Sequence, residues 1–201
     1  CNTAVTPACL KDLYNFADYK IDPKGAVKLG VSGFLEQLAR YADLEQFTSR
    51  FAPNAASNFS TVAVNGMSAV LKLVGELLTP RVGGTLDQNA TDDSVEANLD
   101  IDYTVGLLDP NIETTFYSTA GRGILVPDLD QPTEADNANE PYLDFFTYLA
   151  GLPDGELPQV LTTSYGEDEQ SVPATYAKKV CDIIGQLGTR GVSVIFSSGD
   201  T

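Results

Sequence analysis

Residues 159–200 read QVLTTSYGEDEQSVPATYAKKVCDIIGQLGTRGVSVIFSSGD. The first part, Gln159–Tyr165, is predicted to be a strand that ends at Gly166, and the middle, Pro173–Gly188, has the spacing of a helix. The last part, Gly191–Ser198, is apolar and rich in β-branched residues, which predicts a buried strand. A strand, a helix and a second strand in this order predict two parallel strands joined by a helical crossover.

The same alternation continues toward the N-terminus and predicts an α/β fold. We expect a mostly parallel central sheet with helices on both faces. Because no internal repeat and no interdomain linker is visible, residues 1–201 are expected to form part of one domain. Residues 1–23 resemble an N-terminal arm, and residues 80–93 and 128–141 are predicted to be polar loops. The other predicted elements are strands at Lys28–Leu35, Phe59–Val64 and Thr114–Ser118, a helix at Leu44–Phe51 capped by Asp43, a helix through Val95, Leu99 and Tyr103 capped by Thr91, Asp92 or Asp93, and a helix at Tyr142–Leu149.

The net charge is strongly negative, since 28 Asp and Glu face 12 Lys and Arg, giving −16 at pH 7. Nucleic acid is not an expected partner, because neutralising phosphates requires a basic surface. The charge fits either an ordinary soluble acidic protein or one adapted to low pH, where protonated carboxyl groups no longer repel. The longest apolar candidate, Val70–Leu78, contains Lys72 and Glu76 and is shorter than the ~20 residues of a membrane helix, so no membrane partner is expected.

Histidine is absent from the sequence, which limits the chemistry available. A Ser-His-Asp site, a Cys-His site and a His-based metal site cannot be completed within this chain. A general base here must therefore be Asp, Glu, Lys, Tyr or a chain terminus.

The three cysteines are Cys1, Cys9 and Cys181. A small disulfide loop between Cys1 and Cys9 is expected, which leaves Cys181 as a buried thiol or as the partner of a cysteine outside this chain. Asn58 and Asn89 each begin a glycosylation sequon. Together with the disulfide, the sequons favour a secretory route, and Cys1 is interpreted as a processed N-terminus.

Two acidic residues, Glu96 and Asp100, lie four residues apart on a predicted helix and therefore share one face. They form either a solvated acidic face or a coupled carboxyl pair. Two unit charges about 4 Å apart repel by ~4 kcal/mol at an effective dielectric near 20, which corresponds to roughly three pKa units. A coupled pair would hold one proton in the acidic range, so one carboxylate could accept a proton from a nucleophile.

Two predicted strands end in small polar residues. Asp200 is either a turn or cap residue, or an acid that donates a hydrogen bond to a developing oxyanion. Ser164, Tyr165 and Gly166 are either an ordinary strand end or a segment that presents its backbone to an extended peptide substrate.

Two further acidic features have a simpler interpretation from the residues alone. Glu36, after the first strand, is expected to be a surface residue. The acidic loop with Asp128, Asp130, Glu134 and Asp136 lacks the glycine and the terminal glutamate of an EF-hand, so we expect a solvated loop and no metal ligands.

Six short motifs follow one another along nearly the whole chain. They are GFLEQ at 33–37, DLEQF at 43–47, EANLD at 96–100, EPYL at 140–143, SYGEDE at 164–169 and SGD at 198–200. Their order and approximate spacing resemble the sedolisin family of serine-carboxyl peptidases, close to its secreted fungal-type tripeptidyl peptidases. The resemblance implies a subtilisin-like α/β fold, of which this chain is the N-terminal portion.

The resemblance also implies roles for individual residues. Glu96 would be the general base, Asp100 its orienting partner and Asp200 the acid of the oxyanion hole. Glu36 matches a position that extends the Glu–Asp hydrogen-bond network in some members.

The substrate strand of the family matches residues that follow the fourth predicted strand. Ser164 and Gly166 match positions that bind the substrate backbone. Tyr165 stands where some members have Trp, which leaves the shape of that subsite open.

The nucleophile of the family lies in a Gly-Thr-Ser motif downstream of the Ser-Gly-Asp motif, and its calcium site is also downstream. Ser197 and Ser198 belong to the Asp200 motif, so neither is expected to be the nucleophile. We therefore expect a C-terminal chain of the same precursor to supply the serine and the calcium site, with Cys181 as a candidate link between the two. The strand Gly191–Ser198 alone would expose an apolar sheet edge.

The expected function is acid peptide hydrolysis through an acyl-enzyme, as a tripeptidyl peptidase acting on peptide or protein substrates. The alternatives are a sedolisin-like endopeptidase and a non-catalytic relative that binds peptides. A carboxylate-only hydrolase of another class is a further alternative, although Asp-Thr-Gly motifs are absent. The expected location is outside the cell, or an acidic compartment such as a lysosome or vacuole.

Overall fold

The computed structural model of the chain describes residues 1–22, 27–65, 88–89 and 94–200. Within these residues, five strands pair in the order β2-β3-β1-β4-β5, and all four pairings are parallel. This arrangement confirms the predicted parallel α/β sheet. The strands are β1 Lys28–Gly33, β2 Ser60–Val64, β3 Glu113–Thr119, β4 Val160–Thr163 and β5 Ser193–Phe196.

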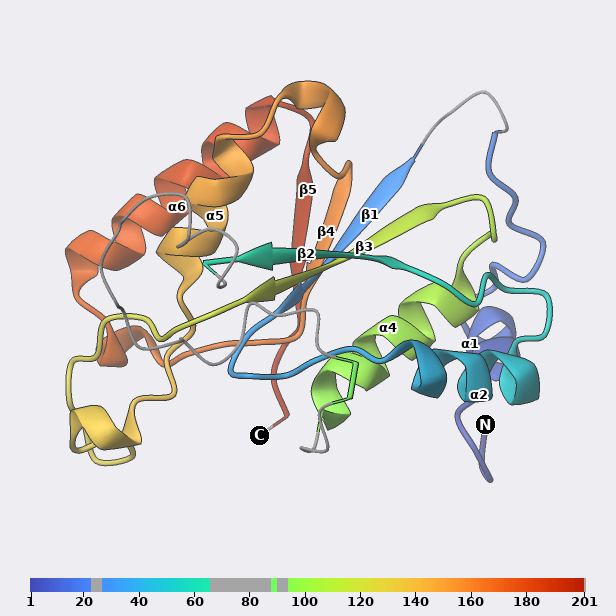
Figure 1. The fold of residues 1–201 in the computed structure, drawn as a ribbon, viewed down its shortest axis with the longest axis horizontal. Helices are drawn as coiled ribbons and strands as arrows, with labels where there is room; N and C mark the ends of the chain where they lie inside the picture. Colours follow the sequence, from blue (N-terminus) through green and yellow to red (C-terminus); the bar gives the residue numbers. More distant parts are fainter. Residues whose placement is uncertain (23–26, 66–87, 90–93, 201) are drawn as a thin grey trace.

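Helices cover both faces of the sheet, as predicted (Figure 1). Helices α5 and α6 lie together on one face, and α1, α2 and α4 lie on the other. The helices are α1 Pro7–Leu13, α2 Tyr41–Phe51, α4 Val95–Leu107, α5 Tyr142–Ala150 and α6 Ala174–Thr189, with single 3₁₀ turns at Glu134–Asp136, Asp154–Glu156 and Glu169–Ser171.

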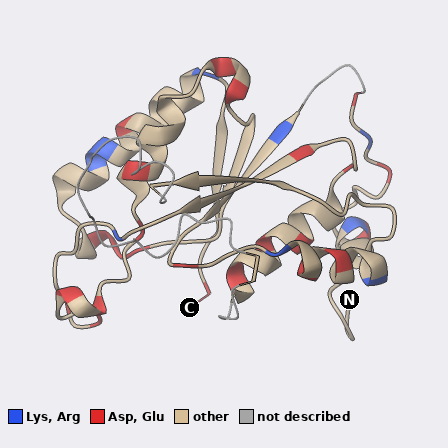
Figure 2. Ribbon diagram, viewed as in Figure 1, with Lys and Arg blue, Asp and Glu red and all other residues tan. Residues whose placement is uncertain are grey.

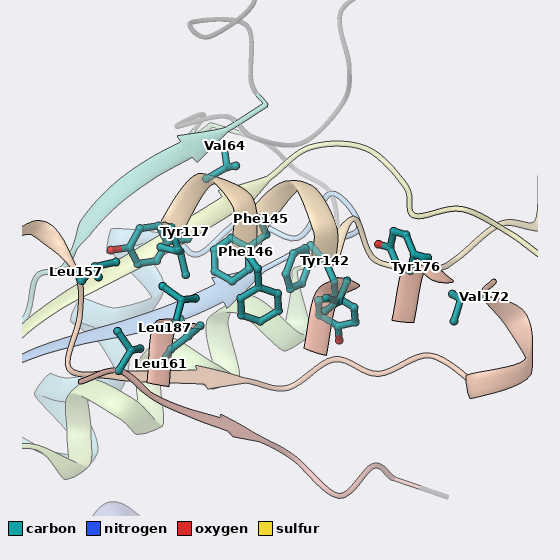
Figure 3. Packing of buried hydrophobic residues seen from close by; sticks show 14 residues of the cluster. Val64, Tyr117, Tyr142, Phe145, Phe146, Leu157, Leu161, Val172, Tyr176 and Leu187 are labelled. Carbon is teal, nitrogen blue, oxygen red and sulfur yellow. The ribbon is translucent and has the colours of Figure 1, made fainter. Parts of the chain in front are cut away.

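Two hydrophobic clusters hold these layers together. Between the sheet and α5 and α6, aromatic side chains dominate, and Figure 3 shows Phe145 and Phe146 of α5 packed above Leu161 of β4. Each such side chain stabilises the fold by about 1.5–3 kcal/mol when it is fully buried. On the other face, the buried side of α4 packs against α2 and the sheet; the cluster comprises Val31, Ala39, Leu44, Phe59, Ala97, Ile101, Val105 and Phe116.

The predicted N-terminal arm contains a short helix, α1. Its N-cap is Thr6, whose hydroxyl accepts a hydrogen bond from the backbone N–H of Cys9 at 3.2 Å. The expected disulfide joins Cys1 to Cys9, whose Cα atoms lie 5.5 Å apart. Tyr103 of α4 donates a hydrogen bond to the carbonyl of Val5, which ties this segment to the helical layer.

Two predicted helix caps were wrong. Helix α2 begins at Tyr41, before the predicted Leu44, so Asp43 lies in its first turn instead of capping it. Helix α4 has Ser94 as its N-cap residue, and the proposed caps at 91–93 lie outside the described residues. The Ser94 hydroxyl accepts from the backbone N–H of Leu38 at 3.0 Å, so a tertiary contact uses the side chain that local capping would otherwise use.

The prediction that the last strand is buried was wrong. β5 is the edge strand of the described sheet, and Ile195 and Phe196 are 54% and 42% exposed. The expected exposure of an apolar sheet edge is therefore present. Cys181 on α6 is a free, exposed cysteine, which excludes the buried-thiol alternative.

Some sequence features lie outside the described residues, namely the apolar segment Val70–Leu78 and nearly all of the predicted loop 80–93. Within the described residues, none of the helices is both long and apolar enough to span a bilayer.

Candidate active site

A cavity of about 690 Å³ opens at the carboxyl ends of β4 and β5. This is the edge where sites form in parallel α/β sheets. All the residues predicted to be catalytic or to bind substrate line it, whereas Glu36 is not among its lining residues. The predicted residues in the lining are Glu96, Asp100, Ser164, Tyr165, Gly166 and Asp200.

The acidic pair lies on α4, whose opposite face is fixed to the sheet by Ala97 and Ile101. Side-chain hydrogen bonds also hold the first turns of α4 to the chain that follows β1. Asn98 accepts from the backbone N–H of Arg40 at 2.9 Å and donates to Asp43 at 3.0 Å. This support gives the two carboxyl groups a defined position at the cavity wall.

Ser164, at the end of β4, donates a hydrogen bond from Oγ to Oδ1 of Asp100 at 2.6 Å. Ser164 was predicted to bind substrate, and its hydrogen bond to Asp100 was not predicted. No sequence signal could have identified it, because the two residues are 64 positions apart and meet only when β4 lies beside α4.

The two carboxyl groups of the pair interact with each other. Burial raises the pKa of Asp100 to about 7; the Ser164 hydroxyl lowers it, and both the charge of Glu96 and its hydrogen bond raise it. Burial also raises the pKa of Glu96, as does the charge of Asp200, whereas hydrogen bonds from Asp100 and Ser164 lower it. Burial and their mutual charge thus make Glu96 and Asp100 a coupled carboxyl pair that titrates as a unit.

Asp200 follows Gly199, whose φ of +89° lies in the region that favours glycine. The strand pairing continues just before this turn, because the backbone N–H of Ser197 donates to the carbonyl of Thr163 at 3.0 Å. The turn directs Asp200 into the lining of the same cavity as the pair, and its charge acts on Glu96.

Tyr165 and Gly166 differ in what surrounds them. The ring of Tyr165 packs edge-on against Phe34, with centroids 5.2 Å apart. Gly166 is exposed, and a Cβ built on it would meet no atom within 4 Å. The segment is thus anchored in the core at Tyr165 and open to the cavity at Gly166.

Glu36 is bound by a residue that sequence reasoning did not single out. Arg122 donates from its two terminal nitrogens to the two oxygens of Glu36, at 2.7 and 2.6 Å. Both Leu35 and Glu36 have positive φ, 53° and 62°, so the ion pair fixes an unfavourable backbone conformation. The expected extension of the Glu96–Asp100 network through Glu36 stays a prediction.

The acidic residues predicted to be solvated are exposed at Asp130, Glu134 and Asp136 and half-buried at Asp128, but the end of the same loop is buried. Asn137, Asn139 and Glu140 are buried, and Asn139 and Gln131 line the cavity, joined by a hydrogen bond of 3.0 Å. Little in the sequence indicated that Asn137 and Asn139 are buried, because amide side chains in a polar loop are more often exposed. Figure 2 shows the acidic residues of this segment on the turn Glu134–Asp136, away from α4.

The described residues offer no group of three His, Cys, Asp or Glu side chains arranged to hold a metal ion. Calcium therefore stays an implication of the family resemblance for a part of the protein beyond this chain. Both sequon residues, Asn58 and Asn89, are exposed, and their glycosylation stays a prediction.

No family model matches the chain. Several curated relatives align with all of it. Probable tripeptidyl-peptidase SED2 of Trichophyton verrucosum is 52% identical over 202 residues, which cover 100% of this chain and 31% of the relative. Tripeptidyl-peptidase SED2 of Arthroderma otae is 50% identical, again over 100% of this chain and 31% of the relative. Tripeptidyl-peptidase SED4 of Arthroderma otae is 48% identical over 204 residues, covering 100% of this chain and 30% of the relative. The chain thus spans about a third of the length of these relatives.

Proposed function

The relatives of this chain, ~50% identical over its whole length, are fungal tripeptidyl-peptidases of the sedolisin family. We propose that the complete protein is an acid-acting serine-carboxyl peptidase that releases tripeptides from its substrates. The observation that supports this best is the meeting of Glu96, Asp100 and Asp200 at one cavity, where burial raises the pKa of both members of the pair.

In the proposed reaction, Glu96 accepts the proton of a serine hydroxyl as the serine oxygen attacks the scissile carbonyl carbon. Asp100 holds Glu96 in place, and Asp200 donates a hydrogen bond to the oxyanion of the tetrahedral intermediate. Glu96 then returns its proton to the departing amine. Water hydrolyses the acyl-enzyme by the same steps, with Glu96 again taking and returning the proton.

The serine belongs to a part of the protein beyond this chain, and we propose that this part packs against β5. The exposed side chains of Ile195 and Phe196 support the proposal, because an unpaired apolar edge is otherwise a site of aggregation. An apolar hollow of about 280 Å³ beside them is lined in part by Phe196, Ile184 and Cys181. Cys181 could then form a disulfide with the same segment.

The proposed setting is outside the cell or in an acidic compartment. The disulfide between Cys1 and Cys9 and the exposed sequon residues support passage through a secretory route.

Product analysis on paired peptides tests the function. The full-length protein at pH ~4 is expected to release tripeptides from a peptide with a free N-terminus and to leave the N-acetylated peptide intact. Cleavage inside the acetylated peptide would replace the tripeptidyl-peptidase assignment with an endopeptidase. Binding of both peptides without cleavage would contradict the enzymatic function.

A further inference from the structure

A second pair of carboxyl groups, Glu140 and Glu167, lies beside the catalytic group. Glu140 precedes α5 and is only 3% exposed, and Glu167 follows β4 and lines the cavity. One oxygen of each side chain, Oε2, is buried without a hydrogen-bond partner in the described structure. The backbone N–H of Glu140 gives both carboxyl groups a hydrogen bond, so each is only partly satisfied. A buried and partly satisfied carboxylate is unfavourable, which favours the protonated form.

Arg122 faces Glu140 but does not pair with it. Both of its terminal nitrogens bind Glu36, and its Nε donates to the carbonyl of Asn137 at 3.0 Å. The guanidinium therefore acts on Glu140 only as a more distant positive charge. Burial raises the pKa of Glu140 to about 8; a hydrogen bond from its own backbone N–H lowers it, the charge of Glu167 raises it further, and the charge of Arg122 lowers it.

The other neighbours of Glu140 are tyrosines from three segments. Burial raises the pKa of Tyr142, Tyr165 and Tyr176, and the charge of Glu140 raises each of them further, so all three hydroxyls stay neutral. Tyr176 donates its hydroxyl to the backbone carbonyl of Glu140 at 3.3 Å, and Figure 3 shows Tyr142 and Tyr176 on neighbouring helices. None of these tyrosines supplies a positive charge that would stabilise an ionised Glu140.

The other member of the pair, Glu167, has a similar environment. Burial raises its pKa to about 7, and the backbone N–H of Glu140 lowers it in part. Glu167 and Glu140 therefore both favour the neutral form under acidic conditions.

The backbone of Glu140 is tightly held. The Gly123 N–H donates to the Asn139 carbonyl at 2.8 Å, and a Cβ on Gly123 would lie 2.5 Å from the Glu140 carbonyl oxygen. The Asn139 side chain also donates to the carbonyls of Ile124 and Ser171, at 3.1 and 3.0 Å. Glu167 is half-buried between the exposed residues Gly166 and Asp168, so repulsion would move Glu167 before Glu140.

We propose that Glu140 and Glu167 are a positioning pair that holds the Ser164–Asp168 segment against the cavity only while at least one of them is protonated. The effect on substrate binding rests on the proposed peptidase function, whereas the effect on folding does not. The folded protein keeps protons that the unfolded chain releases near pH 4.5. Stability is therefore greatest in acid and declines as pH rises from about 4.5 toward 7 and 8, by about tenfold in the folded-to-unfolded ratio per pH unit for each group.

Denaturant unfolding of the full-length protein between pH 4 and 8 tests the pair. In Glu140→Gln, the decline of the folded-to-unfolded ratio between pH 5 and 7 is expected to be about 100-fold smaller than in the wild type. Glu167→Gln is expected to flatten the same range and serves alone if Glu140→Gln does not fold. Glu169→Gln, an exposed acid on the same segment, is the matched control with the wild-type slope. Wild-type slopes in both Gln variants at 140 and 167 would overturn the proposal.

Enzyme kinetics distinguish an effect on the position of the Ser164–Asp168 segment from an effect on folding stability alone. In the wild type, KM for a peptide is expected to rise above pH ~7, and in Glu140→Gln this rise is absent, because the two positions can no longer both be charged, while the pH dependence of kcat is unchanged. Identical KM profiles in the two proteins would overturn the positioning role. An inactive protein would contradict the proposed function. Peptide binding would then be measured by calorimetry over the same pH range, and an identical pH dependence of affinity in the wild type and Glu140→Gln would overturn the positioning role.

Discussion

The two carboxyl pairs of this chain, Glu96–Asp100 and Glu140–Glu167, differ in their place at the cavity, because both members of the first pair line it and only Glu167 of the second does. Asp100 accepts a hydrogen bond from the Ser164 hydroxyl, and burial raises its pKa to about 7. Burial raises the pKa of Glu140 to about 8, and its Oε2 has no described hydrogen-bond partner. Each of these acids has one buried oxygen without a described hydrogen-bond partner, but Asp100 also accepts from a side-chain hydroxyl and lines the open cavity.

Substitutions in the first pair, Glu96 and Asp100, are expected to have the largest effect on activity. Glu96→Gln or Asp100→Asn is expected to lower kcat by about 10³–10⁴-fold, because Gln cannot accept the serine proton and Asn cannot hold Glu96 in the same way. Steady-state kinetics at pH ~4 on a peptide with a free N-terminus provides the measurement. Glu45→Gln, an exposed acid on α2, is the control and should retain wild-type kcat. Near wild-type turnover in either active-site variant would contradict the mechanism.

Phe34 connects the surroundings of the two pairs, because its buried ring packs edge-on against both Tyr142 and Tyr165. Phe34→Ala is expected to lower the free energy of unfolding by about 3–5 kcal/mol, measured by denaturant titration at pH ~4. Leu13→Ala, at an exposed position on α1, should change it by less than ~0.5 kcal/mol. A small effect of Phe34→Ala would mean that the two regions are not coupled through this ring.

Removing the Ser164 hydroxyl is expected to have a smaller effect. It would leave Asp100, like Glu140, without a described hydrogen bond from a side-chain hydroxyl. In the wild type, activity should fall as pH rises through about 7, where Asp100 loses its proton. Ser164→Ala removes the hydrogen bond that favours ionised Asp100, so this fall should move up by about one pH unit, with about tenfold lower kcat. Ser164→Thr, which keeps a hydroxyl, should leave the pH profile in place. An unchanged profile in Ser164→Ala would show that the hydrogen bond does not set the pKa of Asp100.

Much of the fold could be predicted because the periodicities are local. The apolar spacing of Pro173–Gly188 predicted a helix and the β-branched run Gly191–Ser198 predicted a parallel strand, and the structure confirms both elements as α6 and β5. Helix starts were less predictable, because Ser94 directs its hydroxyl to Leu38, a residue distant in sequence. The exposure of β5 also depends on its place at the sheet edge, which its composition does not reveal.

In the candidate site, too, residues with a local sequence signal were predicted and contacts between distant segments were not. The sequence identified the acidic residues at 96, 100 and 200 as candidates, and the motifs around them indicated the family. The contact of Ser164 with Asp100, the pairing of Glu36 with Arg122 and the burial of Glu140 were not predictable, since each depends on segments far apart in sequence.

Composition, periodicity and ordered motifs are properties of the linear chain. They therefore indicated the parallel α/β class and the sedolisin family, and they excluded a histidine-based site within these 201 residues. The surroundings of each acid, in contrast, depend on the tertiary structure, which buries Glu140 and places Asp100 beside Ser164. Burial and hydrogen bonding control the free energy of each charge, and both arise when α4, the ends of β4 and β5 and the loop before α5 meet around one cavity.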